Sequence, residues 1–400
     1  MHPGNFHGEA AGRLIQVGKG DAAYWAFVPH PLPPPVMYTP ELIQTLSQAD
    51  RALGELAGLG RALSNPHLLI HPFIRREAVL SSRIEGTQTD LPHLYAYESG
   101  QLVFPGFEPT PPESDLREVL NYVHALEYGL ERMKTLPVSL RLLREIHARL
   151  MEGVRGEGAY PGEFRRSQNW IGPPGCTLNE ATFVPPPPEY LMETLKDFER
   201  YLHEEDQHPP LIRLAFIHYQ FEAIHPFVDG NGRIGRLLLI LLLVGWELLP
   251  LPLLYLSAYF ERKRQAYYDH LFRVSMEGAW ESWIRFFLEG VAEQAADTID
   301  RIKQLQDLQS LWRRKLSQGR VSANLLRLVD HLFEEPIITV TRAATIMGIT
   351  YPAAQRNIER LVKEGILLPM DDRPYGRAFV CHEILRVLGI VTGWAKDEDI

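Results

Sequence analysis

One stretch of twelve residues, 225–236, holds most of the side chains with which this sequence could do chemistry. It consists of His-Pro-Phe-Val-Asp-Gly-Asn-Gly-Arg-Ile-Gly-Arg. Pro226 disfavours a helical conformation for the residue before it, so the amphipathic run 211–224 is expected to stop there and leave His225 on a turn. An imidazole on a turn can reach a substrate, and its pKa near neutrality suits a general base.

The second half of this stretch has the features of a phosphate-binding site. Gly230 and Gly232 allow the backbone to approach a ligand, and Asn231 begins the next helix, whose first N–H groups and dipole favour an anion. Arg233 and Arg236 lie three residues apart and therefore share one face of the first turn. Two cations are unfavourable there unless an anion binds, and their fork geometry suits a polyphosphate.

Each residue of the stretch also has a simpler interpretation. His225 alone could be a hydrogen-bonded structural histidine, and Asp229 could cap the helix that follows. His218 and Glu222 lie four residues apart on the preceding helix and could join His225 as metal ligands, although glycines and arginines suit phosphate better than zinc. The combination at fixed spacing favours phosphate chemistry.

Composition indicates a globular chain with more than one domain. The 400 residues are enough for two or three domains, and 45% of them are hydrophobic. The longest apolar run, residues 237–244, is far shorter than the roughly 20 residues that span a bilayer, so a buried helix is expected. The chain has two cysteines, and residues 1–12 do not form a basic and apolar leader. The cytoplasm is therefore the expected location, with no membrane partner.

The helices that must position residues 225–236 follow from apolar periodicity and end signals. Residues 1–40, rich in Gly and Pro, are expected to form an extended arm. Helices are expected from Thr39-Pro40-Glu41 onward and then at about 72–84, 113–133, 139–152, 189–204, 211–224, 257–276 and 279–318.

Helical periodicity is lost between residues 153 and 185. Residues 170–184 could form a short hairpin that turns at Pro173-Pro174-Gly175. Such a hairpin is weakly stabilised alone, so its open edge could pair with an extended peptide. A plain surface loop explains the same composition.

The C-terminal segment differs from the rest in charge and pattern. The whole chain carries a net charge of −9, but residues 301–390 contain 14 Lys and Arg against 9 Asp and Glu, a net of +5. Helices are expected at 322–335, 341–347 and 351–364, with a turn at Gly348, and strands at 366–370 and 377–381 joined through Asp371-Asp372-Arg373. This order resembles a winged helix-turn-helix whose third helix carries Gln355, Arg356, Arg360 and Lys363.

A second short motif, Ser81-Ser82-Arg83-Ile84-Glu85-Gly86, ends the helix expected at 72–84. A glutamate beside a helix C-terminus opposes the macrodipole, so local stability does not explain Glu85. Without further information it is an exposed residue before a C-cap glycine.

Residues 225–236 resemble the signature of the Fic family, His-x-Phe-x-Asp/Glu-Gly-Asn-Gly-Arg-x-x-Arg, and match every specified position. Residues 211–222 and Ser257-Ala258-Tyr259-Phe260 are also similar to the family, so the resemblance spans about 110–290. Ser81-x-x-x-Glu85-Gly86 resembles the inhibitory helix motif of those members that carry it before the catalytic core.

The resemblance implies an all-helical core with a small β-hairpin flap. The expected order is an N-terminal arm and a helical region with the inhibitory helix (1–110), the catalytic core (111–300), and a linker helix with a winged-helix domain (301–400). It further implies a protein adenylyltransferase, which moves AMP from ATP to a Ser, Thr or Tyr hydroxyl of a target protein and releases pyrophosphate.

The family also implies roles for individual residues. His225 would be the general base, Asp229 would hold Mg²⁺, and Glu85, with Ser81, would inhibit by pairing with Arg236. The nucleotide phosphates would be bound by Gly230, Asn231, Gly232, Arg233 and Arg236. The flap residues that hold the target segment would be Trp170, Ile171, Gly172, Thr182 and Phe183.

Several alternatives stay open at this point. Some relatives use the inhibitory glutamate to position water and remove AMP from a modified target. A DNA-binding transcriptional regulator with a Fic-like, nucleotide-sensing core is an alternative of another class, in which the winged helix contacts DNA or a protein. The target is an unidentified protein or the chain itself, the donor could be another nucleotide or phosphocholine, and a homodimer is also consistent with the sequence.

Overall fold

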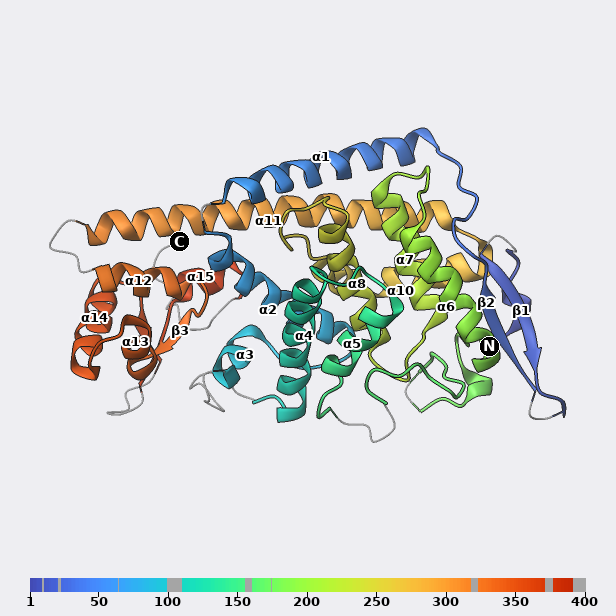
Figure 1. The fold of residues 1–400 in the computed structure, drawn as a ribbon, viewed down its shortest axis with the longest axis horizontal. Coiled ribbons are helices and arrows are strands. Elements are labelled where there is room, and N and C mark those ends of the chain that lie inside the picture. Colours follow the sequence, from blue (N-terminus) through green and yellow to red (C-terminus); the bar gives the residue numbers. More distant parts are fainter. Residues whose placement is uncertain are drawn as a thin grey trace. The chain divides into compact units, whose positions relative to one another are not determined.

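The computed structural model describes residues 1–8, 11–20, 23–63, 65–98, 110–154, 160–173, 175–317, 323–370 and 377–390. Helices dominate these residues, and the strands form two small antiparallel sheets (Figure 1). The expected fold class, mainly helical with small β elements, is confirmed. The chain divides into two compact units: the first unit is Met1–Gly58 with Asn121–Ala295, and the second unit is Leu59–Leu120 with Ala296–Ile400.

Two buried helices form the centre of the first unit, α7 (Pro210–Ile224) and α8 (Asn231–Gly245). The amphipathic character expected of α7 is wrong, because from residue 211 to 224 all side chains are buried except the partly exposed Arg213 and Glu222. Helices α6 (Pro188–His203) and α8 and strand β2 all pack on α7, so its polar residues lie inside the unit too. The prediction of a buried helix after residue 236 is confirmed for α8.

The other helices of the first unit lie close to their expected ranges. Ser139 accepts a hydrogen bond from Leu142 N–H and so caps α5 (Leu140–Leu150) as its residue type predicts. The expected helix 257–276 is two helices, α9 (Ser257–Arg262) and α10 (Arg264–Glu277). Three helices have residues in both units: α1 (Pro40–Ala62), α4 (Glu113–Arg132) and α11 (Trp280–Leu316).

The N-terminal arm, which was expected to be extended, contains a β-hairpin. After a short 3₁₀ helix (Pro3–Asn5), β1 (Gly12–Val17) pairs antiparallel with β2 (Tyr24–Pro29), with Gly12 opposite Pro29 and Val17 opposite Tyr24. Apolar and aromatic residues flank a turn with two positive-φ glycines, Gly18 and Gly20, which is a sequence signal for a hairpin. Phe27 N–H donates to Val184 O at 2.8 Å. Strand β2 of the hairpin is thus hydrogen-bonded to the end of the segment 170–184, which was expected to form the flap.

In the second unit, helices α2 (Pro66–Ile84) and α3 (Leu91–Glu98) come from the N-terminal half of the chain. The expected start of α2 near Pro72 is wrong, because Pro66 stands in the first turn, where its missing N–H costs nothing, and the helix continues through Pro72. The Arg75 guanidinium donates to both carboxylate oxygens of Glu98 at 2.9 Å and so ties α2 to α3.

The rest of the second unit combines helices with a small sheet. The helices are α12 (Ala323–Leu332), α13 (Val340–Met347), α14 (Tyr351–Lys363) and α15 (His382–Val387). The strands β3 (Ile337–Thr339), β4 (Leu368–Pro369) and β5 (Ala378–Val380) form a sheet in the order β3-β5-β4. The sequence predicted two of these strands and missed β3, which is only three residues long. The expected link Asp371–Arg373 lies outside the described residues.

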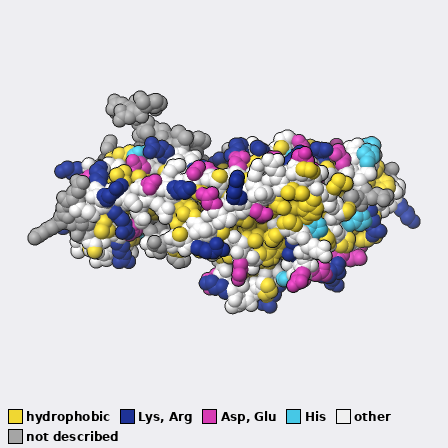
Figure 2. Space-filling model, turned by 90° about the horizontal axis from the view of Figure 1, so that it is seen from above, with side chains coloured by type: hydrophobic (Ala, Val, Ile, Leu, Met, Phe, Trp, Pro, Cys, Tyr) yellow, Lys and Arg dark blue, Asp and Glu magenta, His cyan; other side chains and the backbone are white. Residues whose placement is uncertain are grey.

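The length and apolar character of the helices and the distribution of charged side chains concern the whole described chain. None of the helices in the described ranges combines the length and apolar character that crossing a membrane requires. Figure 2 shows Lys and Arg side chains lying among Asp and Glu side chains, so on the described part of that face the two signs are mixed.

Candidate active site

The His225 turn, residues 225–230, joins α7 to α8. His225 ends α7 with its N–H donating to Phe221 O at 3.0 Å, and its backbone is left-handed, with φ 49° and ψ 61°. That conformation is unfavourable by about 1–2 kcal/mol for a residue with a side chain. Pro226 favours an extended backbone before it, which adds to the strain. The turn that the sequence predicted therefore exists, in a conformation that its surroundings must hold.

The His225 imidazole is half-buried and oriented by its own helix. Its Nδ1 lies 3.3 Å from Glu222 O, and a carbonyl oxygen can only accept a hydrogen bond, so Nδ1 carries the proton in this arrangement. The lone pair is then on Nε2, which is the atom that can accept a proton from a substrate.

Asn231 closes the turn on itself. Its side chain is 2% exposed, Oδ1 accepts from Phe227 N–H at 2.8 Å, and Nδ2 donates to Phe227 O at 2.9 Å. The side chain thus satisfies both backbone polar groups of the buried Phe227. The backbone N–H of Asn231 lies at the start of α8, where it can contact an anion.

His147 of α5 packs against the turn. It was not among the predicted site residues. Its ring stacks on Phe227 with centroids 3.8 Å apart and planes at 7°. Nδ1 accepts from Gly162 N–H at 2.9 Å, so the proton is on Nε2, which donates to Asp229 O at 3.1 Å. Burial lowers the pKa of His147 to about 4 and keeps the ring neutral. A histidine on the apolar face of an amphipathic helix was the only signal for this role.

Asp229 is exposed on the turn, and Gly230 beside it is buried. The Asp229 side chain is 59% exposed, its Oδ1 accepts from Gly230 N–H at 2.6 Å, and it lies 3.9 Å from Arg233 Nη2. Gly230 has φ 75°, and a Cβ there would lie 3.1 Å from Met151 Sδ. Gly230 thus supplies both a left-handed backbone and close packing that other residues do not allow.

The first turn of α8 presents buried positive charge. Arg233 is 3% exposed and Arg236 is 2% exposed, although both precede a run of buried leucines. The first hydrogen bond of the helix ladder goes from Ile234 N–H to Gly230 O, so the N–H groups of residues 231–233 precede the ladder. Two buried guanidinium groups beside the positive end of a helix dipole make this a site suited to anions.

The flap, residues 170–184, has less β-pairing than the hairpin that was expected there. Its two sides meet at one β-bridge, where Ile171 N–H donates to Phe183 O at 2.8 Å and Phe183 N–H donates to Ile171 O at 3.0 Å. Trp170 and Ile171 are 41% and 40% exposed, whereas Phe183 is buried against Phe27. Thr182 N–H also donates to Ile171 O, and a Cβ on Gly172 would collide with Cys176. Val184 O is bonded to β2, whereas the opposite edge of the flap, along residues 170–172, pairs with no further strand among the described residues.

Ser81 and Glu85 belong to the second unit. Ser81 is completely buried in α2, and Glu85 is the exposed C-cap residue, followed by Gly86 with φ 103°. The helix end that the sequence predicted is confirmed, and Gly86 supplies the left-handed conformation that ends it.

The metal site considered for His218, Glu222 and His225 is not formed. His218 Nε2 and the Tyr267 hydroxyl share a hydrogen bond of 2.8 Å inside a cluster with Phe260 and Trp283. Burial lowers the pKa of His218 to about 3. Within the described ranges, His, Cys, Asp and Glu side chains are nowhere grouped in the threes that a metal site needs.

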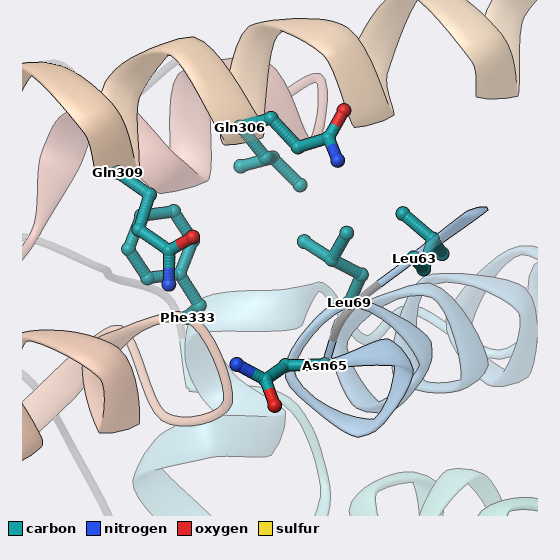
Figure 3. A pocket seen from close by; sticks show the side chains of 7 residues that line it. Leu63, Asn65, Leu69, Gln306, Gln309 and Phe333 are labelled. Atoms are coloured by element: carbon teal, nitrogen blue, oxygen red, sulfur yellow. The ribbon is translucent and has the colours of Figure 1, made fainter. Parts of the chain in front are cut away.

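A small hollow of about 90 Å³ lies within the second unit (Figure 3). Gln306 and Gln309 enter it from α11, Leu69 comes from α2, and Phe333 follows α12. Its lining is completed by Leu63, Asn65 and Leu305. These side chains are amides and hydrocarbons with no acid, base or nucleophile, so the hollow has no catalytic chemistry.

Two regions of the chain match models of known protein families. Residues 43–131 match the model of the Fic/DOC family N-terminal region, and residues 137–243 match that of the Fic/DOC family. These two regions of the chain are therefore similar to the two regions of that family, and residues 225–236 lie inside the second match.

Several related proteins are named protein adenylyltransferase Fic. The Drosophila persimilis protein is 30% identical over 188 residues, which are 46% of this chain and 32% of that protein. The Drosophila melanogaster protein is 29% identical over 188 residues, 46% of this chain and 33% of that protein. The chain spans about a third of the length of the curated relatives it matches.

Solved structures share the fold. A Fic family protein from Desulfovibrio desulfuricans aligns with a TM-score of 0.53 at 20% identity, over 88% of this chain and 98% of that one. Fic-1 from C. elegans aligns with a TM-score of 0.52 at 23% identity, over 66% of this chain and 74% of that one.

Proposed function

We propose that this protein transfers AMP from ATP to a Ser, Thr or Tyr hydroxyl of a target protein. The arrangement that supports this most is a histidine whose Nδ1 faces Glu222 O, which makes Nε2 the basic nitrogen, six residues before the start of α8, whose first turn carries two buried arginines. A base and an anion site on one turn suit the attack of a hydroxyl on a phosphate. The name of the related Drosophila proteins supports the same reaction.

In the proposed step, the target hydroxyl oxygen attacks the α-phosphorus of ATP. The new bond joins that oxygen to phosphorus, and the bond from phosphorus to the oxygen bridging to the β-phosphate breaks, so pyrophosphate leaves. His225 Nε2 takes the hydroxyl proton. Asn231 and Gly232 would bind phosphate oxygens through backbone N–H groups, and Gly230, whose N–H donates to Asp229, would let the backbone come close to the phosphates. Arg233 and Arg236 would balance the phosphate charge.

Mg²⁺ would be held by Asp229 together with phosphate oxygens. A single exposed carboxylate fits this role, because Mg²⁺ on nucleotides usually takes one or two protein carboxylates and keeps several waters. When bound, the ion would neutralise phosphate charge.

The flap would bind the target chain in an extended form. The edge of residues 170–172 is the open one, and the exposed Trp170 and Ile171 side chains lie on it. Backbone pairing along such an edge aligns a peptide without requiring one particular sequence. Gly172, Thr182 and Phe183 would maintain the shape of the flap.

We also propose that Glu85 restrains this activity by pairing with Arg236, with Ser81 holding the end of α2. Glu85→Gly is then expected to modify itself or an added target at least about 10-fold faster than the unsubstituted protein, since a competing ion pair is removed. Intact-mass analysis of both proteins after incubation with Mg²⁺ and ATP measures the added AMP. Equal modification of both would refute the restraint but leave the transfer reaction standing.

Removal of AMP from a modified target is the alternative direction for the same residues. In that case Glu85 orients water, and Glu85→Gly loses activity instead of gaining it. Incubating AMP-modified product with each protein in the absence of ATP distinguishes the two directions.

A second function is proposed for residues 323–390, binding of duplex DNA as a winged helix. Helices α13 and α14 pack together across Gly348, which has φ 65°, and the sheet order β3-β5-β4 suits a wing. Gln355, Arg356 and Lys363 are exposed on α14, although Gln355 also bonds to Glu359. Affinity of the full chain for duplex DNA should fall with salt and with Arg356→Ala. Unchanged affinity in Arg356→Ala, or no binding at low salt, would refute this function.

A further inference from the structure

Arg165 is a buried arginine whose hydrogen bonds go to backbone carbonyls. It is 3% exposed, its Nε donates to His225 O at 2.9 Å, and its other nitrogens donate to the carbonyls of Ile224, Pro186 and Ser167. A guanidinium group has five donors in a rigid plane, so it can hold several carbonyls at fixed directions. Burial lowers the pKa of Arg165 to about 10, which still leaves it charged at neutral pH.

Asn169 bonds to the same turn from four residues further along. Its Nδ2 donates to His225 O at 3.3 Å and to Phe227 O at 2.9 Å. The backbone N–H of Arg165 donates to Pro226 O at 2.9 Å, so three successive carbonyls of the turn are bonded to the 165–169 segment. Asn231 holds the Phe227 peptide from the other side.

These bonds act on the strained residue of the site. The His225 backbone is left-handed and precedes a proline, and the carbonyl that follows its ψ angle is the one bonded by both Arg165 and Asn169. A strained conformation persists only where the surroundings over-determine it. Rotation of that peptide would break both bonds and move the imidazole with the backbone.

The segment also leads directly into the flap. Trp170 and Ile171 follow Asn169, and Ile171 forms the bridge to Phe183. The other side of the flap is bonded too, because Arg165 Nη2 donates to Pro186 O and Gln168 Nε2 donates to Pro185 O at 3.0 Å. One side of the flap therefore begins directly after Asn169, and the other side leads to Pro186, which Arg165 bonds. Both sides of the flap are thus connected to the residues that bond to the His225 carbonyl.

We propose that Arg165 and Asn169 are positioning residues that fix the His225 peptide in its left-handed conformation and couple the flap to the catalytic histidine. Only the activity readout of this proposal rests on the proposed adenylyl transfer. A target segment paired with residues 170–172 would, through this coupling, meet an imidazole already in place.

The chain offers a matched control, because Arg166 is the neighbouring arginine and is exposed. Arg165→Gln and Arg166→Gln remove the same charge, but only the first removes the bonds to the turn. Asn169→Asp keeps the side-chain shape and removes the two donated bonds. Arg165→Lys keeps the charge with fewer aligned donors and should lie between Arg165→Gln and the unsubstituted protein.

Hydrogen exchange by mass spectrometry, on peptides that cover residues 221–232, tests the positioning without any activity. We expect exchange to rise about 10-fold or more in Arg165→Gln, since bonds from a charged donor are lost, and several-fold in Asn169→Asp. Arg166→Gln should not change it. Unchanged exchange in folded Asn169→Asp and Arg165→Gln would overturn the proposal, and if Arg165→Gln does not fold, Asn169→Asp decides.

Kinetics in the Glu85→Gly background separate positioning from general loss of structure. We expect kcat for AMP transfer to fall about 10- to 100-fold in Arg165→Gln with KM for ATP within about twofold, because the base is displaced while phosphate binding is kept. A loss confined to KM, or an equal loss in Arg166→Gln, would overturn the proposal. If the unsubstituted and Glu85→Gly proteins transfer no AMP, the proposed reaction fails while the exchange data still decide on positioning.

Discussion

The His225 turn and the flap are neighbours in the first unit, and they are built in opposite ways. In the turn, peptide groups are bonded by buried side chains: Asn231 to Phe227, His147 to Asp229, and Arg165 to His225. The flap has one β-bridge, an open edge, and Trp170 and Ile171 about 40% exposed.

This difference matches the demands on the two partners of the proposed reaction. The nucleotide is always the same molecule, so a preorganised turn loses nothing by being fixed and needs no rearrangement at the moment of reaction. Target chains differ in sequence, and an edge that offers backbone hydrogen bonds accepts different side chains. Substitutions in the turn and in the flap should therefore have different effects on nucleotide and target.

The largest effect is expected for His225→Ala. Removing a general base lowers the rate about 10²- to 10⁴-fold, and ATP binding should change little because the phosphate-binding groups stay. Transfer rates and ATP affinity, measured on the same Glu85→Gly background, test this. A variant that keeps its transfer rate would show that the turn supplies no base.

A smaller effect is expected for Asp229→Asn. The amide keeps the size of the side chain but is a weaker ligand for a hard cation, so the rate at low Mg²⁺ should fall about 10²-fold and recover in part as Mg²⁺ is raised. Titrating Mg²⁺, and removing it with EDTA, tests the assignment. Rates independent of Mg²⁺ in both proteins would contradict it.

Two glycines with left-handed backbones, one in each region, allow the packing of the turn and the flap to be compared by the same substitution. Gly230 in the turn has φ 75° and packs near Met151 and Leu150, whereas Gly175 in the flap has φ 80° with nothing within 4 Å of a built Cβ. We expect Gly175→Ala to cost about 1 kcal/mol of unfolding free energy and Gly230→Ala about 2–3 kcal/mol, because crowding adds to strain. Denaturant unfolding measures both, and equal costs would mean that the turn is no more tightly packed than the flap.

The smallest effect is expected in the flap itself. Trp170→Ala should raise KM for a protein target about 10-fold, as one exposed contact is lost, and leave ATP affinity unchanged. Steady-state kinetics with varied target and with varied ATP measure the two constants. If ATP affinity falls equally, the flap is not a separate target-binding element.

Much of the helical framework could be predicted from local signals. Ser139 caps α5, Gly86 ends α2 and His225 ends α7 before Pro226, all as residue types at those positions predict. The failures have physical reasons. The polar side chains of α7 are covered by the three elements α6, α8 and β2. Pro66 and not Pro72 begins α2, and short strands such as β3 carry too few residues to show a pattern.

In the candidate site, too, the residues that are close in sequence could be predicted, and those that are distant in sequence could not. Residues 225–236 are contiguous, so the sequence alone brings them together, and the structure adds the conformations of His225 and Gly230. His147, Arg165 and Asn169 come from distant parts of the chain and act on backbone atoms. A hydrogen bond to a carbonyl leaves no mark in the sequence of the residue that accepts it, so the bonds from these three residues to the turn could not be predicted.

The most direct test of the proposed reaction follows which phosphate of ATP reaches protein. Glu85→Gly protein, with Mg²⁺ and a lysate, is incubated with ATP labelled at either the α- or the γ-phosphate, and Glu85→Gly/His225→Ala serves as the control. Adenylyl transfer predicts protein labelling from the α-phosphate alone, lost in the control. Labelling from the γ-phosphate, or α-labelling that persists without His225, would contradict the account.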